Sequence, residues 1–214
     1  MPLLFQESIH PPGEWGLWCI DESEAALRAA LTVVHPHEED RLRCIKGAER
    51  RREFLAARLL LHQMSGRERR GRLIKDTDGK PHLEDSLFFI SISHTVGLSA
   101  AMAHPHVCGI DVQRIVPRIT HLAPKFVGTQ EREQLIPAEE LLQLHLIWSA
   151  KEAMYKAYGR RQLDFREHLF VNLKGYRSGL SAATGYVQTG DTRMEFSLDW
   201  KVYGDFVLVA AVEV

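Results

Sequence analysis

The chain has 214 residues, 45% hydrophobic and 26% charged, which suits one large globular domain or two domains of about 100 residues. Its formal net charge of −1 argues against a protein that coats nucleic acid, so we expect no nucleic-acid partner. The three cysteines form no CxxC pair, which argues against a disulfide framework or a zinc ribbon.

The first half of the chain alternates predicted strands and helices. Its opening residues carry no basic leader, and no run approaches the roughly 18 apolar residues of a membrane span. We therefore expect a cytoplasmic protein without a membrane partner. The expected strands are 15–21, 72–75, 87–95, 97–103 and 108–115, and the expected helices are 22–31 after a cap at Asp21 or Ser23, a segment beginning near Pro36, and 48–64 ending at Gly66.

The second half repeats this mixture of elements. We expect a short helix over 130–136 after a Thr129 cap, a long helix over 138–158, and strands over 169–174, 184–190, 193–203 and 206–214. Helices beside mostly antiparallel strands predict an α+β fold. The division falls near 103–107, which gives an N-terminal half of 1–106 and a C-terminal half of 107–214.

The long helix carries the first candidate for chemistry. Trp148, Glu152 and Lys156 are four residues apart and therefore share one helix face. A surface Glu–Lys pair is the commoner explanation of this spacing. The aromatic and apolar residues around it predict partial burial, and a half-buried carboxylate needs a cationic partner or a metal.

Asp111 is the second candidate, because it interrupts the apolar strand "CGIDVQR". A lone acid in a strand commonly faces solvent, and alternation allows Ile110 and Val112 to point inward with Asp111 outward. Together with Glu152 it offers two hard oxygen ligands, which suit Mg²⁺.

The remaining candidates are polar residues next to predicted strands, turns and helices. Adjacent side chains of a strand face opposite ways, so Ser93 and His94 do not form a Ser-His hydrolase pair, and no GxSxG motif is present. Lys80 stands in the Gly-Lys-Pro turn of "DGKPHL". Arg58 lies within "FLAARLLL", where its charge needs an anion or an internal carboxylate as partner.

Taken in order, these segments resemble the Sfp-type 4'-phosphopantetheinyl transferases. The likeness is carried by "REFLAAR" (52–58), "GKPHL" (79–83), "SISHT" (91–95), "GIDVQ" (109–113) and "WSAKEAMYKAYG" (148–159), and it spans about 35–160. The resemblance implies two similar α+β halves related by a pseudo-twofold axis. It also implies Mg²⁺-dependent transfer of the phosphopantetheine arm of coenzyme A to a serine of an acyl or peptidyl carrier protein, with release of 3',5'-ADP.

The resemblance also implies roles for individual residues. Asp111 and Glu152 would hold Mg²⁺, so that the metal answers the charge of Asp111, and Glu152 would accept the serine proton. Lys156 would reach the leaving phosphate. The residues implied for coenzyme A are Lys80 and Pro81 at the adenine side, Ser93 and His94 at the phosphates, and Arg41, Arg52 and Arg58 at the 3'-phosphate.

One position departs from many members of the family. Gln113 stands where a second acid often follows the aspartate, so we expect an amide or water ligand and weaker metal binding. The change leaves open a degenerate relative that binds coenzyme A or a carrier without transfer. A Mg²⁺-dependent phosphodiesterase or nuclease is a third reading, but it would need a basic groove or more acids.

The partner is expected to be an acidic, helical carrier protein of fatty-acid, polyketide or nonribosomal peptide synthesis. Local basic and apolar residues suit such a surface, and the segment 121–128 together with the start of the long helix is the candidate docking site. Two fused halves predict a monomer.

Overall fold

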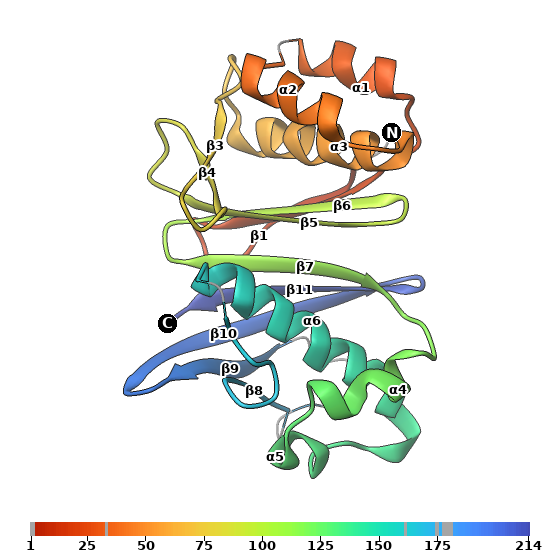
Figure 1. Ribbon diagram of the computed structural model, residues 1–214, viewed down its shortest axis with the longest axis vertical. Coiled ribbons are helices and arrows are strands. Elements are labelled where there is room, and N and C mark those ends of the chain that lie inside the picture. Colours follow the sequence, from red (N-terminus) through yellow and green to blue (C-terminus); the bar gives the residue numbers. More distant parts are fainter. Residues whose placement is uncertain (1–2, 33, 161, 174–175, 177–181) are drawn as a thin grey trace.

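In a computed structural model the chain forms two antiparallel sheets that pack against each other and are covered by helices on their outer faces (Figure 1). The structure describes residues 3–32, 34–160, 162–173, 176 and 182–214. The result is the expected α+β fold, with helix and strand segregated into layers.

The first sheet is built from the N-terminal part of the chain and the second from the C-terminal part. Sheet A has the strand order β1-β2-β6-β5-β4-β3, and sheet B has the order β7-β11-β10-β9-β8. The strands of sheet A are β1 (Leu3–Ser8), β2 (Glu14–Cys19), β3 (Leu73–Lys75), β4 (Pro81–Leu83), β5 (Phe89–Thr95) and β6 (Leu98–His104). Those of sheet B are β7 (Cys108–Arg114), β8 (Leu169–Asn172), β9 (Ala182–Thr189), β10 (Thr192–Tyr203) and β11 (Phe206–Glu213).

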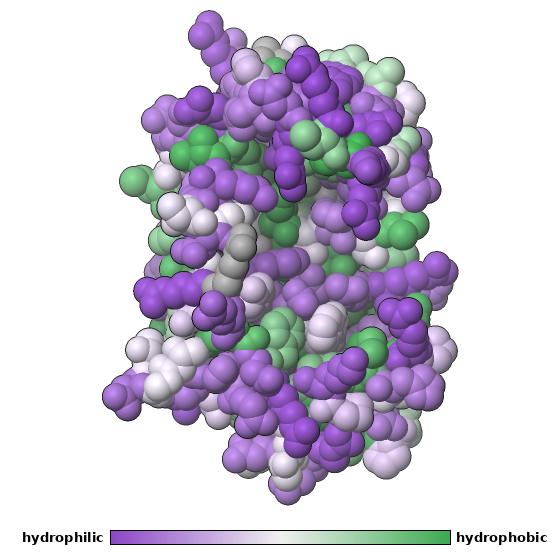
Figure 2. All heavy atoms as spheres, viewed as in Figure 1, coloured by the Kyte–Doolittle hydropathy of each residue, from purple (hydrophilic) through white to green (hydrophobic). Residues whose placement is uncertain are grey.

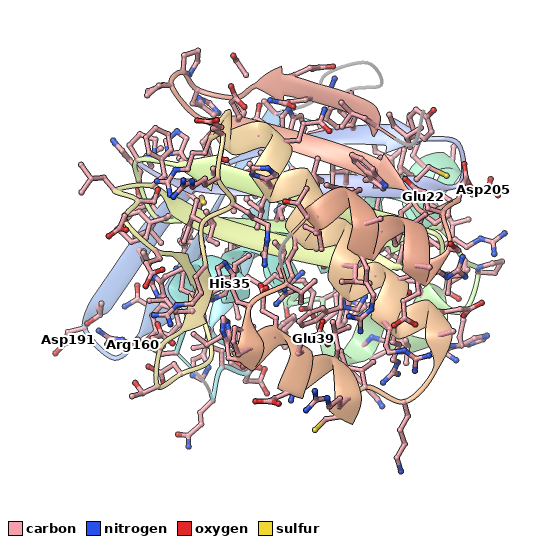
Figure 3. All side chains as sticks on the ribbon, turned by 90° about the horizontal axis from the view of Figure 1, so that it is seen from above. Glu22, His35, Glu39, Arg160, Asp191 and Asp205 are labelled. Carbon is pink, nitrogen blue, oxygen red and sulfur yellow. The ribbon has the colours of Figure 1, made fainter. Side chains whose placement is uncertain are left out.

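The helices divide between the two outer faces. Sheet A is covered by α1 (Glu24–Leu31), α2 (Pro36–Cys44) and α3 (Ala48–Ser65), and sheet B by α6 (Glu140–Tyr158). Seen from above, α1 to α3 lie across the strands beneath them (Figure 3). The short helical segments α4 (Ile119–Leu122), η1 (Ala123–Lys125), α5 (Thr129–Arg132) and η2 (Pro137–Glu139) connect β7 to α6.

Three apolar cores hold these layers together. One lies under α1 to α3, and a second lies under α6. The third lies between the sheets, where inward residues of β2, β6, β7 and β11 meet, among them Leu17, Met102, Ile110 and Leu208. Burial of these side chains stabilises the contact between the halves by about 1.5–3 kcal/mol each.

The helix boundaries follow local signals in the sequence. Ser23 caps α1 by accepting a hydrogen bond from the Ala26 amide, and Pro36 begins α2. Gly66 and Gly159 end α3 and α6 in left-handed conformations, with φ of 60° and 73°. These boundaries agree with those expected from the sequence to within about two residues.

Several expectations about local structure are wrong. The first strand of the chain is β1, which the expected strand at 15–21 leaves out, and segments 119–122 and 123–125 are helical turns that no pattern indicated. Gly128, not Thr129, precedes α5, which has only four residues. The last residue of the strand expected over 169–174 lies outside the described residues.

Strand β7 is covered on both sides, because it runs between β5 and α6. A Cβ atom on Gly109 would lie 1.9 Å from the Ala153 carbonyl oxygen, so this position allows β7 to approach the backbone of α6. On the other side, the hydroxyls of Ser91 and Ser93 accept hydrogen bonds from the amides of β7 at Ile110 and Val112. The two halves are therefore joined by hydrogen bonds as well as by apolar packing.

Within the described residues, no helix has the length and apolar character that crossing a bilayer would require.

Candidate active site

Asp111 lies at the centre of a polar cluster where β7, β5 and α6 meet. Its Oδ1 accepts hydrogen bonds from Lys156 Nζ at 2.8 Å and from Ser93 Oγ at 2.9 Å. Lys156 Nζ also contacts Ser93 Oγ at 2.8 Å and the Ile110 carbonyl oxygen at 2.9 Å. The structure thus brings together three residues that are up to 63 positions apart in the sequence.

Burial of Asp111 corrects the expectation that this side chain faces outward. Asp111 is only 2% exposed, because Gly109 and Asp111 share the face of β7 that α6 covers. The sequence suggested a metal as the partner that compensates the charge of Asp111. In the structure the ammonium of Lys156 pairs with Oδ1, a partner that this expectation did not include. The second oxygen, Oδ2, is buried and lacks a hydrogen-bond partner among the described residues.

Glu152 lies on α6 one turn before Lys156, in a setting that disfavours its charge. Burial, followed by the negative charge of Asp111, raises the pKa of the Glu152 carboxyl to about 7, against the opposing effect of Lys156. A carboxyl with a pKa near neutrality is suited to accept and release a proton at physiological pH. The two carboxylates are therefore close enough for the charge of one to affect the protonation of the other.

Ser93 and His94 face opposite ways, as their places on a strand predict. Ser93 is buried against Asp111 and Lys156, whereas His94 is largely exposed at the end of β5. His94 Nδ1 lies 2.9 Å from Glu53 Oε2 of α3. This partner was not expected, because only the tertiary structure brings α3 next to the end of β5.

Lys80 joins the Gly-Lys-Pro turn of the first half to the end of α6. Its Nζ donates a hydrogen bond to the Ala157 carbonyl oxygen at 2.5 Å, and burial lowers its pKa. Carbonyls in the last turn of a helix lack partners within the helix, so a lysine there satisfies one of them. Pro81 begins β4 directly after this lysine.

The three arginines expected at the 3'-phosphate have different surroundings. Arg58 is buried and pairs with Glu38 at 2.9 Å, which is the internal-carboxylate alternative for its charge. Arg52 reaches the Glu22 carbonyl oxygen at 3.5 Å, and Arg41 is exposed on α2.

A lysine that sequence reasoning missed lies near two of these arginines. Burial lowers the pKa of Lys75, and the charges of Arg41 and Arg58 lower it further. All three cations therefore lie close together, and Glu38 also pairs with Arg70, so one carboxylate serves several cations. This surplus of positive charge suits an anionic group. The signal for Lys75 was absent because β3 has only three residues and carries no motif.

Gln113 follows Asp111 by two positions on β7 and so points to the same side of the strand. No group of three or more His, Cys, Asp and Glu side chains among the described residues has the arrangement of a metal site. Any metal at this place would have to be held by Asp111 and Glu152, with Gln113 nearby.

Trp148, which shares the helix face of Glu152, is packed between Phe126 and Phe165, at ring-centroid distances of 5.0 and 5.4 Å. Next to Glu152, Lys151 is fully buried and donates to Glu131 Oε2 at 2.7 Å and to the carbonyl oxygens of Phe126 and Phe165. Lys151 therefore fixes the segment before α6 against the helix that carries Glu152.

The polar cluster is distinct from a groove of about 910 Å³ between β1 and β10. That groove is lined by none of the site residues expected from the sequence, and its charged residues pair with each other, His10 with Asp199 and Lys201 with Glu7. In the view of Figure 2, hydrophilic side chains cover most of the face that carries α6, with smaller hydrophobic patches scattered between them.

Comparison with known proteins agrees with the two-part construction. Residues 107–208 match the family described as the 4'-phosphopantetheinyl transferase superfamily, and 38–104 match the 4'-phosphopantetheinyl transferase N-terminal domain. The chain belongs to the 4'-phosphopantetheinyl transferase superfamily.

Individual proteins are also similar to this chain in sequence. The enterobactin synthase component D of Salmonella typhimurium is 37% identical over 170 residues, which cover 76% of this chain and 66% of the relative. That of Salmonella typhi is 37% identical over 134 residues, which cover 59% of this chain and 55% of the relative. The chain thus spans between about half and two thirds of the length of these relatives.

Proposed function

We propose that the protein transfers the 4'-phosphopantetheine arm of coenzyme A to a serine of a carrier protein, with release of 3',5'-ADP. The observation that carries this proposal is the cluster of Asp111, Glu152 and Lys156, in which one carboxyl has a pKa of about 7 and the other pairs with the lysine. Membership of the superfamily supports the same reaction.

Two features of the cluster fit a divalent cation. Asp111 Oδ2 is a buried oxygen without a partner among the described residues, and Glu152 is half-buried and close enough for the charge of Asp111 to raise its pKa. Two carboxylates of this kind repel each other unless a proton or a cation lies between them. We propose that they hold Mg²⁺, with Gln113 contributing an amide oxygen or orienting a water, and that the ion neutralises charge on the diphosphate.

The side chains of the cluster then have separate tasks. Glu152 accepts the hydroxyl proton of the carrier serine while the serine oxygen attacks the β-phosphorus of coenzyme A. The bond from this phosphorus to the bridging oxygen breaks, and 3',5'-ADP leaves. Lys156 places a positive charge at the phosphate oxygens, where negative charge builds up as the bond breaks. Asp111 and Ser93 hold Lys156 in place through their hydrogen bonds.

Coenzyme A is proposed to lie along the boundary of the halves, with its phosphates at Ser93 and His94. Lys80 and Pro81 would frame the adenine side. The cations around Arg58 that remain accessible, Arg41 and Lys75, suit the 3'-phosphate better than Arg58 itself, which Glu38 already neutralises. Arg52 remains a candidate for the same group.

The proposed protein substrate is an acidic carrier domain. Segment 121–128 and the start of α6 remain the candidate docking surface, in which Lys125 and His121 are exposed and Phe126 is buried. The relatives are named as components of enterobactin synthase, and this favours a carrier domain of a peptide synthase. Action as a cytoplasmic monomer built from halves 1–106 and 107–214 is part of the same proposal.

The test is a mass-shift assay against a panel of apo carrier domains with coenzyme A and Mg²⁺. We expect a gain of about 340 Da on the carrier, the mass of a phosphopantetheine modification. Glu152→Gln should abolish the gain, and Glu195→Gln, which removes an exposed carboxylate on β10 away from the candidate docking surface, should leave it unchanged. Binding of coenzyme A without any mass gain at any metal concentration would instead support a degenerate relative.

A further inference from the structure

We propose that Glu53 is a positioning residue that orients His94 toward the phosphates of coenzyme A. The inference rests on the proposed function, because it concerns the same site. It gives a role to Glu53, a buried acid of α3 that lies within the segment "REFLAAR" but to which the sequence assigned no task.

The geometry of the pair is that of a carboxylate holding an imidazole. Glu53 Oε2 lies 2.9 Å from His94 Nδ1, and the two side chains are 10% and 53% exposed. Glu53 is buried on α3, on the helix face that also carries the buried residues Ala57 and Leu60, so its carboxylate has little access to water. A buried carboxylate is retained at such a position only if it has a donor, and His94 supplies it.

This contact determines which nitrogen of His94 is free. A carboxylate oxygen 2.9 Å from Nδ1 attracts a proton to this nitrogen and limits rotation of the ring, which leaves Nε2 for a ligand. Because neighbouring Ser93 faces Asp111 and Lys156, the backbone of β5 places the two residues on either side of one strand end.

Glu53 also compensates for positive charge on the imidazole. A protonated His94 that pairs with Glu53 presents an N–H donor to a phosphate, and it also gives the buried carboxylate of Glu53 a partner of opposite charge. Without Glu53 the ring would be free to rotate, and part of the binding energy of the phosphate would be lost in ordering it. The effect should therefore appear in binding of coenzyme A rather than in the chemical step.

The experiment compares Glu53→Met with the matched control Glu49→Met, which removes an exposed acid one turn earlier on α3. Transfer to an apo carrier is measured at varied concentrations of coenzyme A. For Glu53→Met we expect the KM for coenzyme A to rise by about five- to tenfold with kcat changed by less than about twofold, in line with the loss of a close charged contact. Glu49→Met should leave both constants unchanged.

A second variant protects the test against misfolding. Glu53→Gln keeps an acceptor oxygen and nearly the same volume, so it should fold and raise the KM for coenzyme A by a smaller factor. Combining Glu53→Met with His94→Ala should raise the KM no further than His94→Ala alone, because Glu53 acts through the histidine.

The outcomes separate this inference from the proposed function. An active wild-type protein in which neither Glu53 variant changes the KM for coenzyme A would overturn the role of Glu53 alone. The role of Glu53 would also be overturned if Glu53→Met raised the KM for coenzyme A by the same factor in the His94→Ala variant as in the wild type. Glu53 would then act on the fold and not through the histidine. A wild-type protein that modifies no carrier would overturn the proposed function, and this inference with it.

Discussion

Lys156 Nζ lies 2.8 Å from Asp111 Oδ1, and the same ammonium contacts Ser93 Oγ at 2.8 Å. The lysine on α6 therefore links the acid of β7 to the serine of β5, which belongs to the other sheet. Its charge also lowers the pKa of Glu152, against the effects of burial and of Asp111. This relationship gives two predictions about pH.

The first concerns the pH profile of transfer. Glu152 must be deprotonated to act as a base, and without metal its pKa is raised to about 7. Bound Mg²⁺ would lower this pKa, so kcat/KM should fall as the pH drops, at a pH that decreases as the Mg²⁺ concentration rises. Lys156→Met removes a charge that lowers this pKa, so the acid limb should move to higher pH and kcat should fall by about 10²-fold. The profile is measured by the rate of carrier modification. If the acid limb of the Lys156→Met profile stayed at the pH of the wild-type limb, the effect of Lys156 on Glu152 would be refuted.

The second concerns stability in the absence of metal. The pKa of Glu152 is raised in the folded state, so the protonated carboxyl is tolerated below pH 4.5 and stability is lost as the pH rises through about 7. Glu152→Gln stays neutral and should avoid this loss. In EDTA at pH 8 we expect its free energy of unfolding to exceed that of the wild type by about 1–3 kcal/mol. Urea titrations at pH 5 and 8 check this, and a difference independent of pH would argue against it.

The third prediction concerns the approach of β7 to α6. A Cβ on Gly109 would lie 1.9 Å from a backbone oxygen of Ala153, which no side-chain rotation can relieve. Gly109→Ala should therefore destabilise the protein by about 3 kcal/mol or more. Gly128→Ala is the matched control, because a Cβ there would lie no nearer than 3.5 Å to any atom of the described residues beyond its two chain neighbours. Thermal unfolding followed by circular dichroism compares the two, and equal melting temperatures would refute the close packing.

The fourth prediction concerns the buried ion pair of Lys151 and Glu131. Lys151→Met leaves the carboxylate of Glu131 buried without its 2.7 Å partner, so we expect a loss of about 3–5 kcal/mol. Lys125→Met, at an exposed position, should change stability by less than about 0.5 kcal/mol. Adding Glu131→Gln to Lys151→Met should recover part of the loss. Chemical denaturation of the wild type, Lys151→Met, Glu131→Gln and the double variant measures this coupling, and strict additivity would show that the pair is not energetically linked.

Local signals in the sequence were enough to predict most of the elements. Helix α3 begins and ends where its pattern and Gly66 indicate, and α6 carries Trp148, Glu152 and Lys156 on one face as their spacing requires. Short elements were missed, because a strand such as β1 depends on pairing with β2 and not on its own residues.

The candidate site was predictable as a set of residue types but not as a set of contacts. The spacing of "GIDVQ" and "WSAKEAMYKAYG" indicated Asp111, Glu152 and Lys156, but not that the lysine would pair with Asp111. The expectation that Asp111 faces outward failed because alternation assumes one solvent-exposed face, and β7 has none.

The sequence by itself determined the types of residue at the site and the order of the elements, because caps, glycines and helical spacing act over a few neighbouring positions. The tertiary structure alone decided which charges meet. The contact of Glu53 with His94 and the pairing of Arg58 with Glu38 join residues 41 and 20 positions apart. Such contacts depend on how the layers pack. Burial then makes each pairing important for stability, because a charge removed from water needs a partner.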